Sequence, residues 1–239
     1  MAIIEHPDVR RMLMRMKAQT QAARALVYYA FGQLDRARAG DAAANARLEL
    51  LTPLAKAHGT DLGNEVASLG IQVHGGMGYI EETGAAQHYR DARIFPIYEG
   101  TNGIQAADLV GRKLSMDQGG TLFALLGEMR GDAEHHDLIR LIEACEDVAR
   151  NLLTSETDDR LAASYPFLTM LSVAVCGWLM EESGRIAARS EGDPQFLKMK
   201  QAAARFHVEQ IVPEALGLTA SAMAKAELLY AVDAEAFAA

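Results

Sequence analysis

Hydrophobic residues recur at helical spacing along most of the chain, and no stretch alternates apolar and polar positions as a strand does. The segment 8–39 follows one helix face, and Pro7 suits the first turn of that helix. After a short polar connection, a second helical stretch runs to about Val73, and Pro53 either kinks its early part or marks its true start. Two long helices joined in this way predict an antiparallel hairpin.

Glycine and proline divide the middle of the chain into shorter pieces. A glycine cluster ends the second helix, a short helix is expected over about 84–92, and Pro96 then forces an extended approach. Thr101 suits the N-cap of a helix that runs to about residue 113. Glu99 is therefore expected just before a helix N-terminus, where the helix dipole favours negative charge.

The polar, glycine-containing segment 115–120 is predicted to separate two helical domains, residues 1–114 and 115–239. Further helices are expected near 121–130, 134–155, 158–189 and 194–232. The apolar run 167–180 is shorter than the roughly 20 residues of a membrane span, so it predicts a buried core helix. Ala, Leu, Met, Arg, Glu and Gln dominate, and the predicted fold is all-α: one helical bundle followed by a second helical domain.

Charge and cysteine content narrow the choice of function class. The net charge is −9, with basic and acidic residues mixed along the chain, which argues against a nucleic-acid partner. Cys145 and Cys176 lack metal-ligand spacing and lie at apolar helical positions, so buried thiols in a reducing compartment are expected. The N-terminal residues lack a signal-peptide pattern, and a soluble cytoplasmic protein is the expectation.

Three segments of the first domain carry a family resemblance. Residues 72–79, 89–93 and 97–105 resemble the C-terminal helical domain of the acyl-CoA dehydrogenases, and the resemblance extends over roughly residues 3–114. Residues 115–239 are similar, by position and helical character, to the additional C-terminal domain of a larger branch that includes enzymes acting on 3-methylmercaptopropionyl-CoA. The glycine cluster is not a dinucleotide fingerprint, because its spacing differs and no strand precedes it.

The resemblance implies specific site residues. The glutamate of the family's Tyr-Glu-Gly-Thr sequence is the base that removes the proton α to the thioester carbonyl, and Glu99 matches it. Desaturation needs such a base and a hydride acceptor, and Glu99 would suit the role in a dry cleft lined by Tyr98 and Gly100. Four further positions match family residues that contact FAD: Gln72, Gly75 and Gly76 on the flavin of a neighbouring subunit, and Thr101 at the active site. One departure is Gly103, which stands where many members have a glutamine.

The resemblance also implies binding partners, and it implies that this chain contains only part of the catalytic machinery. It implies an acyl-CoA substrate, electron transfer to an electron-transferring flavoprotein and a homo-oligomer. The family places most flavin and substrate contacts in an N-terminal helical domain and a central β-domain, which these 239 residues do not encode. The isolated chain is therefore expected to be inactive and not to retain FAD. Two alternatives stay open: a helical oligomerisation or scaffold module without flavin chemistry, and an acyl-CoA oxidase.

Other conspicuous residues are assigned structural roles. His74 is as well explained by the turn as by a cofactor contact. The adjacent His135 and His136 are expected to diverge on a helix, so no metal site is predicted. Arg90, Asp91 and Arg93 are expected to form ion pairs on a short helix.

Overall fold

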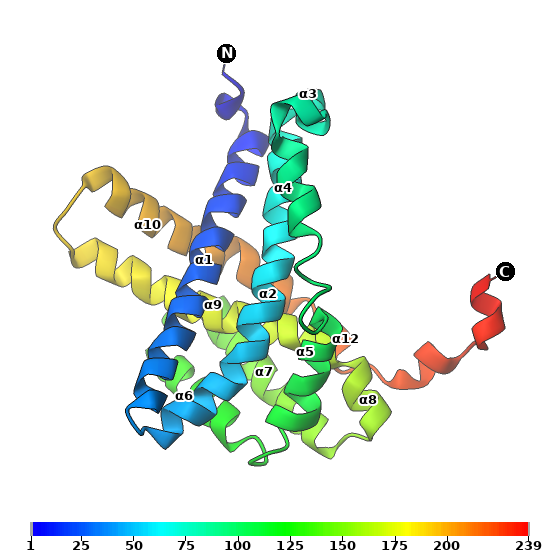
Figure 1. The fold of residues 1–239 in the computed structure, drawn as a ribbon. Coiled ribbons are helices and arrows are strands. Elements are labelled where there is room, and N and C mark those ends of the chain that lie inside the picture. Colours follow the sequence, from blue (N-terminus) through cyan, green and yellow to red (C-terminus); the bar gives the residue numbers. More distant parts are fainter. Residues whose placement is uncertain (1, 239) are drawn as a thin grey trace.

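The computed structural model describes residues 2–238, and within these residues the regular structure is helical and contains no strand (Figure 1). The all-α prediction is confirmed. The first part comprises α1 (Pro7–Arg38), α2 (Ala42–His74), α3 (Gly76–Tyr79), α4 (Ala85–Ala92) and α5 (Asn102–Asp108), with 3-10 turns η1 (Ile3–Glu5) and η2 (Glu81–Thr83) and a π-helical turn η3 (Leu109–Lys113). The second part comprises α6 (Gly120–Asp132), α7 (His136–Thr154), α8 (Thr157–Ala162), α9 (Ser164–Arg189), α10 (Pro194–Phe206), a π-helical turn η4 (His207–Ile211), α11 (Val212–Leu216), α12 (Thr219–Ala222), and 3-10 turns η5 (Ala226–Tyr230) and η6 (Ala234–Ala238).

The predicted hairpin is formed by α1 and α2, which have 32 and 33 residues and run antiparallel (Figure 1). Gly40 takes a left-handed conformation (φ 97°) at the connection. Asp41 then caps α2 by accepting a hydrogen bond from the Ala44 N–H at 3.0 Å. Because α2 begins at Ala42, Pro53 lies inside the helix and does not mark its start.

Two of the long helices predicted in the second part are divided. The predicted helix 158–189 is interrupted at Ala163, between α8 and α9. In the predicted helix 194–232, the continuous α-helix ends at Phe206. Pro213 lacks an N–H to continue the helical ladder, and the π-helical turn η4 comes just before it. Ala226, at the start of η5, is buried, and its N–H donates to the Asp159 Oδ1 of α8 at 2.9 Å. The residues that follow it are exposed, and the chain then extends away from the helical body (Figure 1).

Helix α9 is the centre of the hydrophobic core. Its residues 170–178 are all buried, and it packs against α1, α2, α7 and α10. One continuous apolar cluster includes Leu26 and Leu54 from the hairpin together with Phe167 and Leu171 from α9. The prediction of a buried core helix at 167–180 is confirmed, and both cysteines are buried free thiols. Among the residues that the structure describes, no helix is long and apolar enough to span a membrane.

Two histidines lie within this core, His58 on α2 and His207 at the start of η4. Burial lowers the pKa of His58 to about 4. Burial, assisted by the nearby His58 and Arg15, lowers the pKa of His207 to about 3. The folded protein therefore holds both imidazoles in the neutral form, whereas a histidine in an unfolded chain has a pKa of about 6.5.

Stability is consequently expected to fall as the pH drops below about 6.5 toward 4, because the unfolded chain binds protons that the folded chain does not. Each histidine contributes a slope of up to about 1.4 kcal/mol per pH unit. Urea unfolding at pH 7.0, 6.0 and 5.5 measures this slope. The variant His58→Gln should flatten it, whereas His6→Gln, at an exposed position, should not. Equal slopes in the wild type and His58→Gln would contradict the assignment.

Candidate functional site

A sharp corner at the end of α2 contains three of the predicted site residues. Gly75 takes φ 62° and ψ −147°, which a residue with a side chain adopts only with strain, and its N–H donates to the Gln72 carbonyl at 3.0 Å. Gly76 begins α3, and both it and Gln72 are exposed. The predicted turn is confirmed, and it lies at the surface of the chain.

The glycines of this corner have different structural requirements. A Cβ on Gly78 would lie 2.3 Å from the Ile71 carbonyl oxygen and 2.8 Å from the Cβ of His74, so only glycine fits there. A Cβ on Gly76 would meet nothing within 4 Å, and its φ is not positive. The fold of the described chain therefore explains why glycine is present at positions 75 and 78, but not why it is present at position 76.

Gly78→Ala is expected to destabilise the corner by about 1–3 kcal/mol because its methyl group collides with backbone. Gly76→Ala is the matched control and should change stability by no more than about 0.5 kcal/mol. Amide hydrogen exchange across residues 68–84 measures both effects. Equal protection in the two variants would show that the close approach at Gly78 is not needed.

The predicted base lies on the loop between α4 and α5. Glu99 has φ 53° and Gly100 has φ 85°, so two successive residues are left-handed. Thr101 then caps α5, its Oγ1 accepting a hydrogen bond from the Ile104 N–H at 3.2 Å. The predicted N-cap is confirmed, as is the position of Glu99 just before a helix N-terminus. A non-glycine residue in the left-handed region costs of order 1 kcal/mol, so surrounding contacts must hold this conformation.

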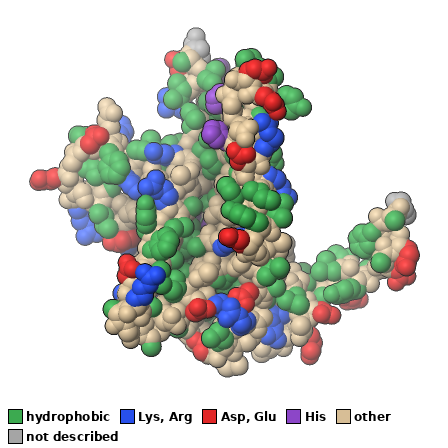
Figure 2. Space-filling model, in the orientation of Figure 1, with side chains coloured by type: hydrophobic (Ala, Val, Ile, Leu, Met, Phe, Trp, Pro, Cys, Tyr) green, Lys and Arg blue, Asp and Glu red, His purple; other side chains and the backbone are tan. Residues whose placement is uncertain are grey.

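The chain alone does not provide the dry cleft expected around Glu99. Glu99 is exposed, and so are the apolar residues beside it on the loop, of which Ile94 and Ile97 are each 49% exposed and Tyr98 is 46% exposed. Figure 2 shows hydrophobic side chains gathered over the segment between α4 and α5. Residues 2–238 by themselves therefore do not meet the condition of a dry cleft around Glu99.

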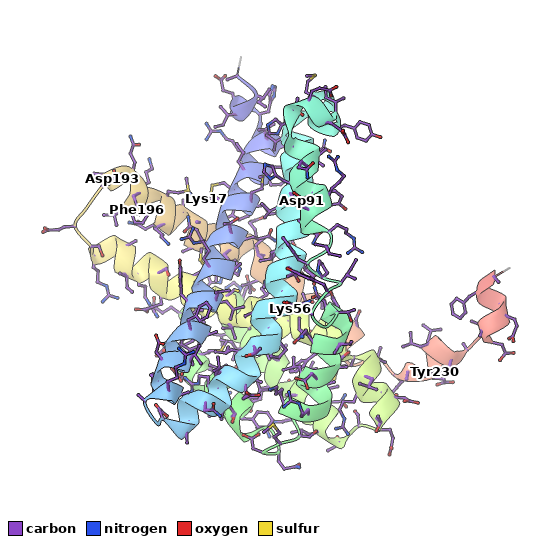
Figure 3. The ribbon with its side chains drawn as sticks, in the orientation of Figure 1. Lys17, Lys56, Asp91, Asp193, Phe196 and Tyr230 are labelled. Atoms are coloured by element: carbon purple, nitrogen blue, oxygen red, sulfur yellow. The ribbon has the colours of Figure 1, made fainter. Side chains whose placement is uncertain are left out.

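Lys56 on α2 anchors this loop, which sequence reasoning missed. Its Nζ donates to the Phe95 carbonyl at 3.1 Å, to the Gly100 carbonyl at 2.7 Å and to the Asn102 Oδ1 at 2.9 Å. These acceptors lie on either side of Glu99, and Figure 3 shows Lys56 beside the segment that leads into α5. A single lysine 44 residues from Gly100 gives no local sequence signal.

The structure separates the predicted site residues into two groups. Glu99 and Thr101 lie near Lys56, whereas Gln72, Gly75 and Gly76 lie at the far end of α2. Sixteen residues of helix between Lys56 and Gln72 correspond to a separation of about 24 Å along the axis. The two groups therefore do not converge on one point of the molecule.

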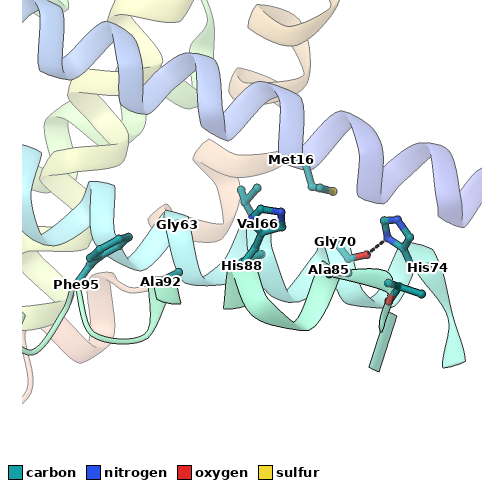
Figure 4. A pocket seen from close by; sticks show the side chains of 12 residues that line it. Met16, Gly63, Val66, Gly70, His74, Ala85, His88, Ala92 and Phe95 are labelled. Atoms are coloured by element: carbon teal, nitrogen blue, oxygen red, sulfur yellow. Dashed lines mark hydrogen bonds between the residues drawn. The ribbon is translucent and has the colours of Figure 1, made fainter. Parts of the chain in front are cut away.

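An apolar groove of about 500 Å³ lies between the two groups (Figure 4). Its walls come from α1, α2 and α4, and it extends from Phe95, close to the Glu99 loop, to His74 and Thr83, close to the glycine corner. The His74 Nδ1 is 2.7 Å from the Gly70 carbonyl oxygen of its own helix, which supports the structural role predicted for this ring. A groove of this size can accommodate part of a small organic ligand.

The expected divergence of His135 and His136 is wrong. His135 is the N-cap of α7 and lies outside the helix, where its Nδ1 accepts a hydrogen bond from the Asp137 N–H at 3.3 Å. One ligand atom from each of His135, His136 and Asp137 consequently lies within 4.8 Å of the others. That no metal binds there stays a prediction. The ion pairs expected around α4 are present only in part: Arg90 lies 3.5 Å from Glu81 in η2, whereas within residues 2–238 Asp91 and Arg93 form no ion pair.

Both halves of the chain match known protein families. Residues 1–114 match the family model of the acyl-CoA dehydrogenase C-terminal domain, and residues 128–233 match the acetyl-CoA dehydrogenase C-terminal like domain. A 3-methylmercaptopropionyl-CoA dehydrogenase of Ruegeria pomeroyi is 45% identical over 235 residues, which cover 89% of this chain and 40% of that protein. A butyryl-CoA dehydrogenase of Syntrophomonas wolfei is 34% identical over 253 residues, covering 94% and 41% of the two chains.

The fold is shared with a solved structure. An acyl-CoA dehydrogenase of Bacillus anthracis complexed with FAD superposes with a TM-score of 0.66 at 21% identity, over 98% of this chain and 45% of that one. The chain spans about 40% of the length of the curated relatives it matches. From its two domain matches and its relatives, the chain belongs to the acyl-CoA dehydrogenase family, of which it represents the C-terminal helical part.

Proposed function

We propose that this chain is the C-terminal part of an FAD-dependent acyl-CoA dehydrogenase in which Glu99 is the catalytic base. The observation that carries the proposal is the backbone at Glu99: the residue is left-handed, on a loop held by Lys56, directly before the capped N-terminus of α5. Strained backbone that is held by surrounding contacts is characteristic of functional sites.

The residues of this loop have distinct roles in the reaction. The Glu99 carboxylate removes the weakly acidic proton from the carbon next to the thioester carbonyl of an acyl-CoA. FAD, when bound, would supply the acceptor for the hydride that leaves the β carbon. The Thr101 oxygen uses one lone pair to cap α5 and keeps its hydroxyl proton to donate to the cofactor.

Gln72, Gly75 and Gly76 would contact a second cofactor, held by a neighbouring copy of the enzyme. Their separation of about 24 Å from the Glu99 loop supports this division, as measured along α2. The corner fits such a contact, because the exposed backbone at Gly76 leaves open space where a Cβ would stand. The working enzyme is then a homo-oligomer.

Other parts of the enzyme must cover the exposed apolar loop around Glu99. A base needs water excluded from its surroundings, and exposed apolar patches mark surfaces that bind a partner or ligand. We therefore expect no dehydrogenase activity and no retained FAD from these 239 residues alone. Electrons pass to an electron-transferring flavoprotein, and the buried thiols fit a location in the reducing cytoplasm.

The test is flavin content and reduction in the full-length enzyme proposed to contain this chain. Stoichiometric FAD that is bleached by one member of a panel of acyl-CoA thioesters, including 3-methylmercaptopropionyl-CoA and butyryl-CoA, would support the proposal. The same assay in oxygen, without an electron-transferring flavoprotein, distinguishes an oxidase by the peroxide it forms. Absence of bound FAD would contradict the proposal and favour a helical scaffold.

A further inference from the structure

The loop that carries Glu99 is held by a chain of polar contacts that extends beyond Lys56. Asn102, the first residue of α5, is only 3% exposed. Its backbone N–H donates to the Pro96 carbonyl at 3.0 Å, which closes the loop on itself. Its side-chain Nδ2 donates to the Ala57 carbonyl at 3.0 Å and to the Asp61 Oδ1 at 2.8 Å. Asn102 therefore attaches the end of the loop to α2.

The second carboxylate oxygen of Asp61 leads to the second helical part. The Tyr165 hydroxyl, in the first turn of α9, donates to the Asp61 Oδ2 at 2.6 Å. Partial burial and the adjacent Asp61 raise the pKa of Tyr165 to about 12, so the hydroxyl stays a neutral donor at physiological pH. Both oxygens of Asp61 thus have donors, one on each part of the chain.

The resulting series is continuous from one part to the other. It runs from Tyr165 through Asp61 and Asn102 to Lys56, and from Lys56 to the Gly100 carbonyl, the residue after Glu99. Its bonds are 2.6–2.9 Å long. Most apolar side chains of the loop are exposed, so polar contacts rather than hydrophobic packing fix its backbone.

We propose that Tyr165 is a positioning residue for Glu99: through Asp61 and Asn102, the second helical part fixes the loop that presents the base. Tyr165 touches no reacting atom in this scheme. It keeps Asp61 oriented toward Asn102, and Asn102 keeps Lys56 and the Pro96 carbonyl in place. The proposal rests on the proposed function only for its catalytic consequence, because fixing the loop is a property of the chain itself.

The first test needs neither flavin nor substrate. Amide hydrogen exchange of residues 93–102 is measured in this 239-residue chain for the wild type, Tyr165→Phe, Lys56→Met and the control Tyr28→Phe. Tyr28 is 64% exposed, and among residues 2–238 its hydroxyl accepts a single long contact of 3.5 Å, from Arg24. Exchange at residues 97, 98 and 102, whose N–H groups are bonded within the loop, should rise several-fold in Tyr165→Phe and more in Lys56→Met.

Unchanged exchange in Tyr165→Phe overturns the proposal, whether or not Lys56→Met accelerates exchange. Equal acceleration in Tyr28→Phe also overturns it, because the effect would then not depend on the contact with Asp61. Thermal unfolding of the same variants shows whether faster exchange arises from the loop or from a general loss of stability. The proposal requires faster loop exchange while the exchange of α7 remains as in the wild type.

The second test measures the catalytic consequence in the full-length flavoenzyme. Tyr165→Phe should lower the rate constant of flavin reduction about tenfold, since a misplaced catalytic group loses rate steeply. FAD content and the acyl-CoA dissociation constant should stay within twofold of wild type. Faster loop exchange in Tyr165→Phe together with an unchanged rate constant of flavin reduction would contradict the positioning role. If Glu99 is not the base, acyl-CoA will reduce the flavin of Glu99→Gln at the normal rate, while the hydrogen-exchange result for Tyr165→Phe is unaffected. Failure of the proposed function is therefore distinguishable from failure of the positioning role.

Discussion

Replacement of Glu99 by glutamine is expected to lower the rate constant of flavin reduction by acyl-CoA by about 10²- to 10⁴-fold, the usual contribution of a positioned general base. Glutamine keeps the length and shape of the side chain but cannot accept the α proton. The backbone of residue 99 should be unaffected, because its left-handed conformation is held by the loop contacts of Lys56 and Asn102. Rapid-mixing absorbance of the flavin in the full-length enzyme measures the effect.

The control for this experiment is Glu82→Gln, an exposed glutamate in η2. It removes one negative charge from the same part of the chain and should leave the reduction rate within twofold. Both variants should bind FAD stoichiometrically. Normal reduction in Glu99→Gln would transfer the role of base to another residue and remove the main site assignment.

Phe167→Ala is expected to destabilise the chain by about 3–5 kcal/mol, the cost of emptying a large site in a close-packed core. Phe167 lies near the start of α9, is fully buried, and belongs to the cluster that joins α9 to the hairpin. The control Phe196→Ala removes the same ring from α10, where it is 57% exposed, and should cost no more than about 0.5 kcal/mol. Urea unfolding of the two variants gives both values.

This variant also tests the proposed division into residues 1–114 and 115–239. If the two parts unfold together, Phe167→Ala should accelerate global amide exchange in α2 as much as in α7, because one apolar cluster contains residues of both. If they unfold separately, the loss should be confined to the helices after residue 115. A destabilisation below about 1 kcal/mol would show that the core rearranges to fill the cavity.

Local sequence signals located most of the candidate site. The left-handed glycine that ends α2 and the Thr101 cap of α5 follow from the conformational preferences of single residues, so they could be read without a structure. The role proposed for Glu99 rests on the resemblance of its flanking residues to a family. What could not be predicted are Lys56, Asp61 and Tyr165, because each acts through a partner at least 39 residues away in the sequence.

The sequence by itself determined the helical character of the chain, the hairpin, the turns and the buried helix α9, because hydrophobic periodicity and the preferences of glycine, proline and N-cap residues act over a few positions. The tertiary structure alone decided where α9 lies against the hairpin, and with it the contact between Tyr165 and Asp61. It also decided that Glu99 is exposed and that the glycine corner stands apart from it. These outcomes depend on how whole helices pack, which involves residues far apart in sequence and is not encoded in any local pattern.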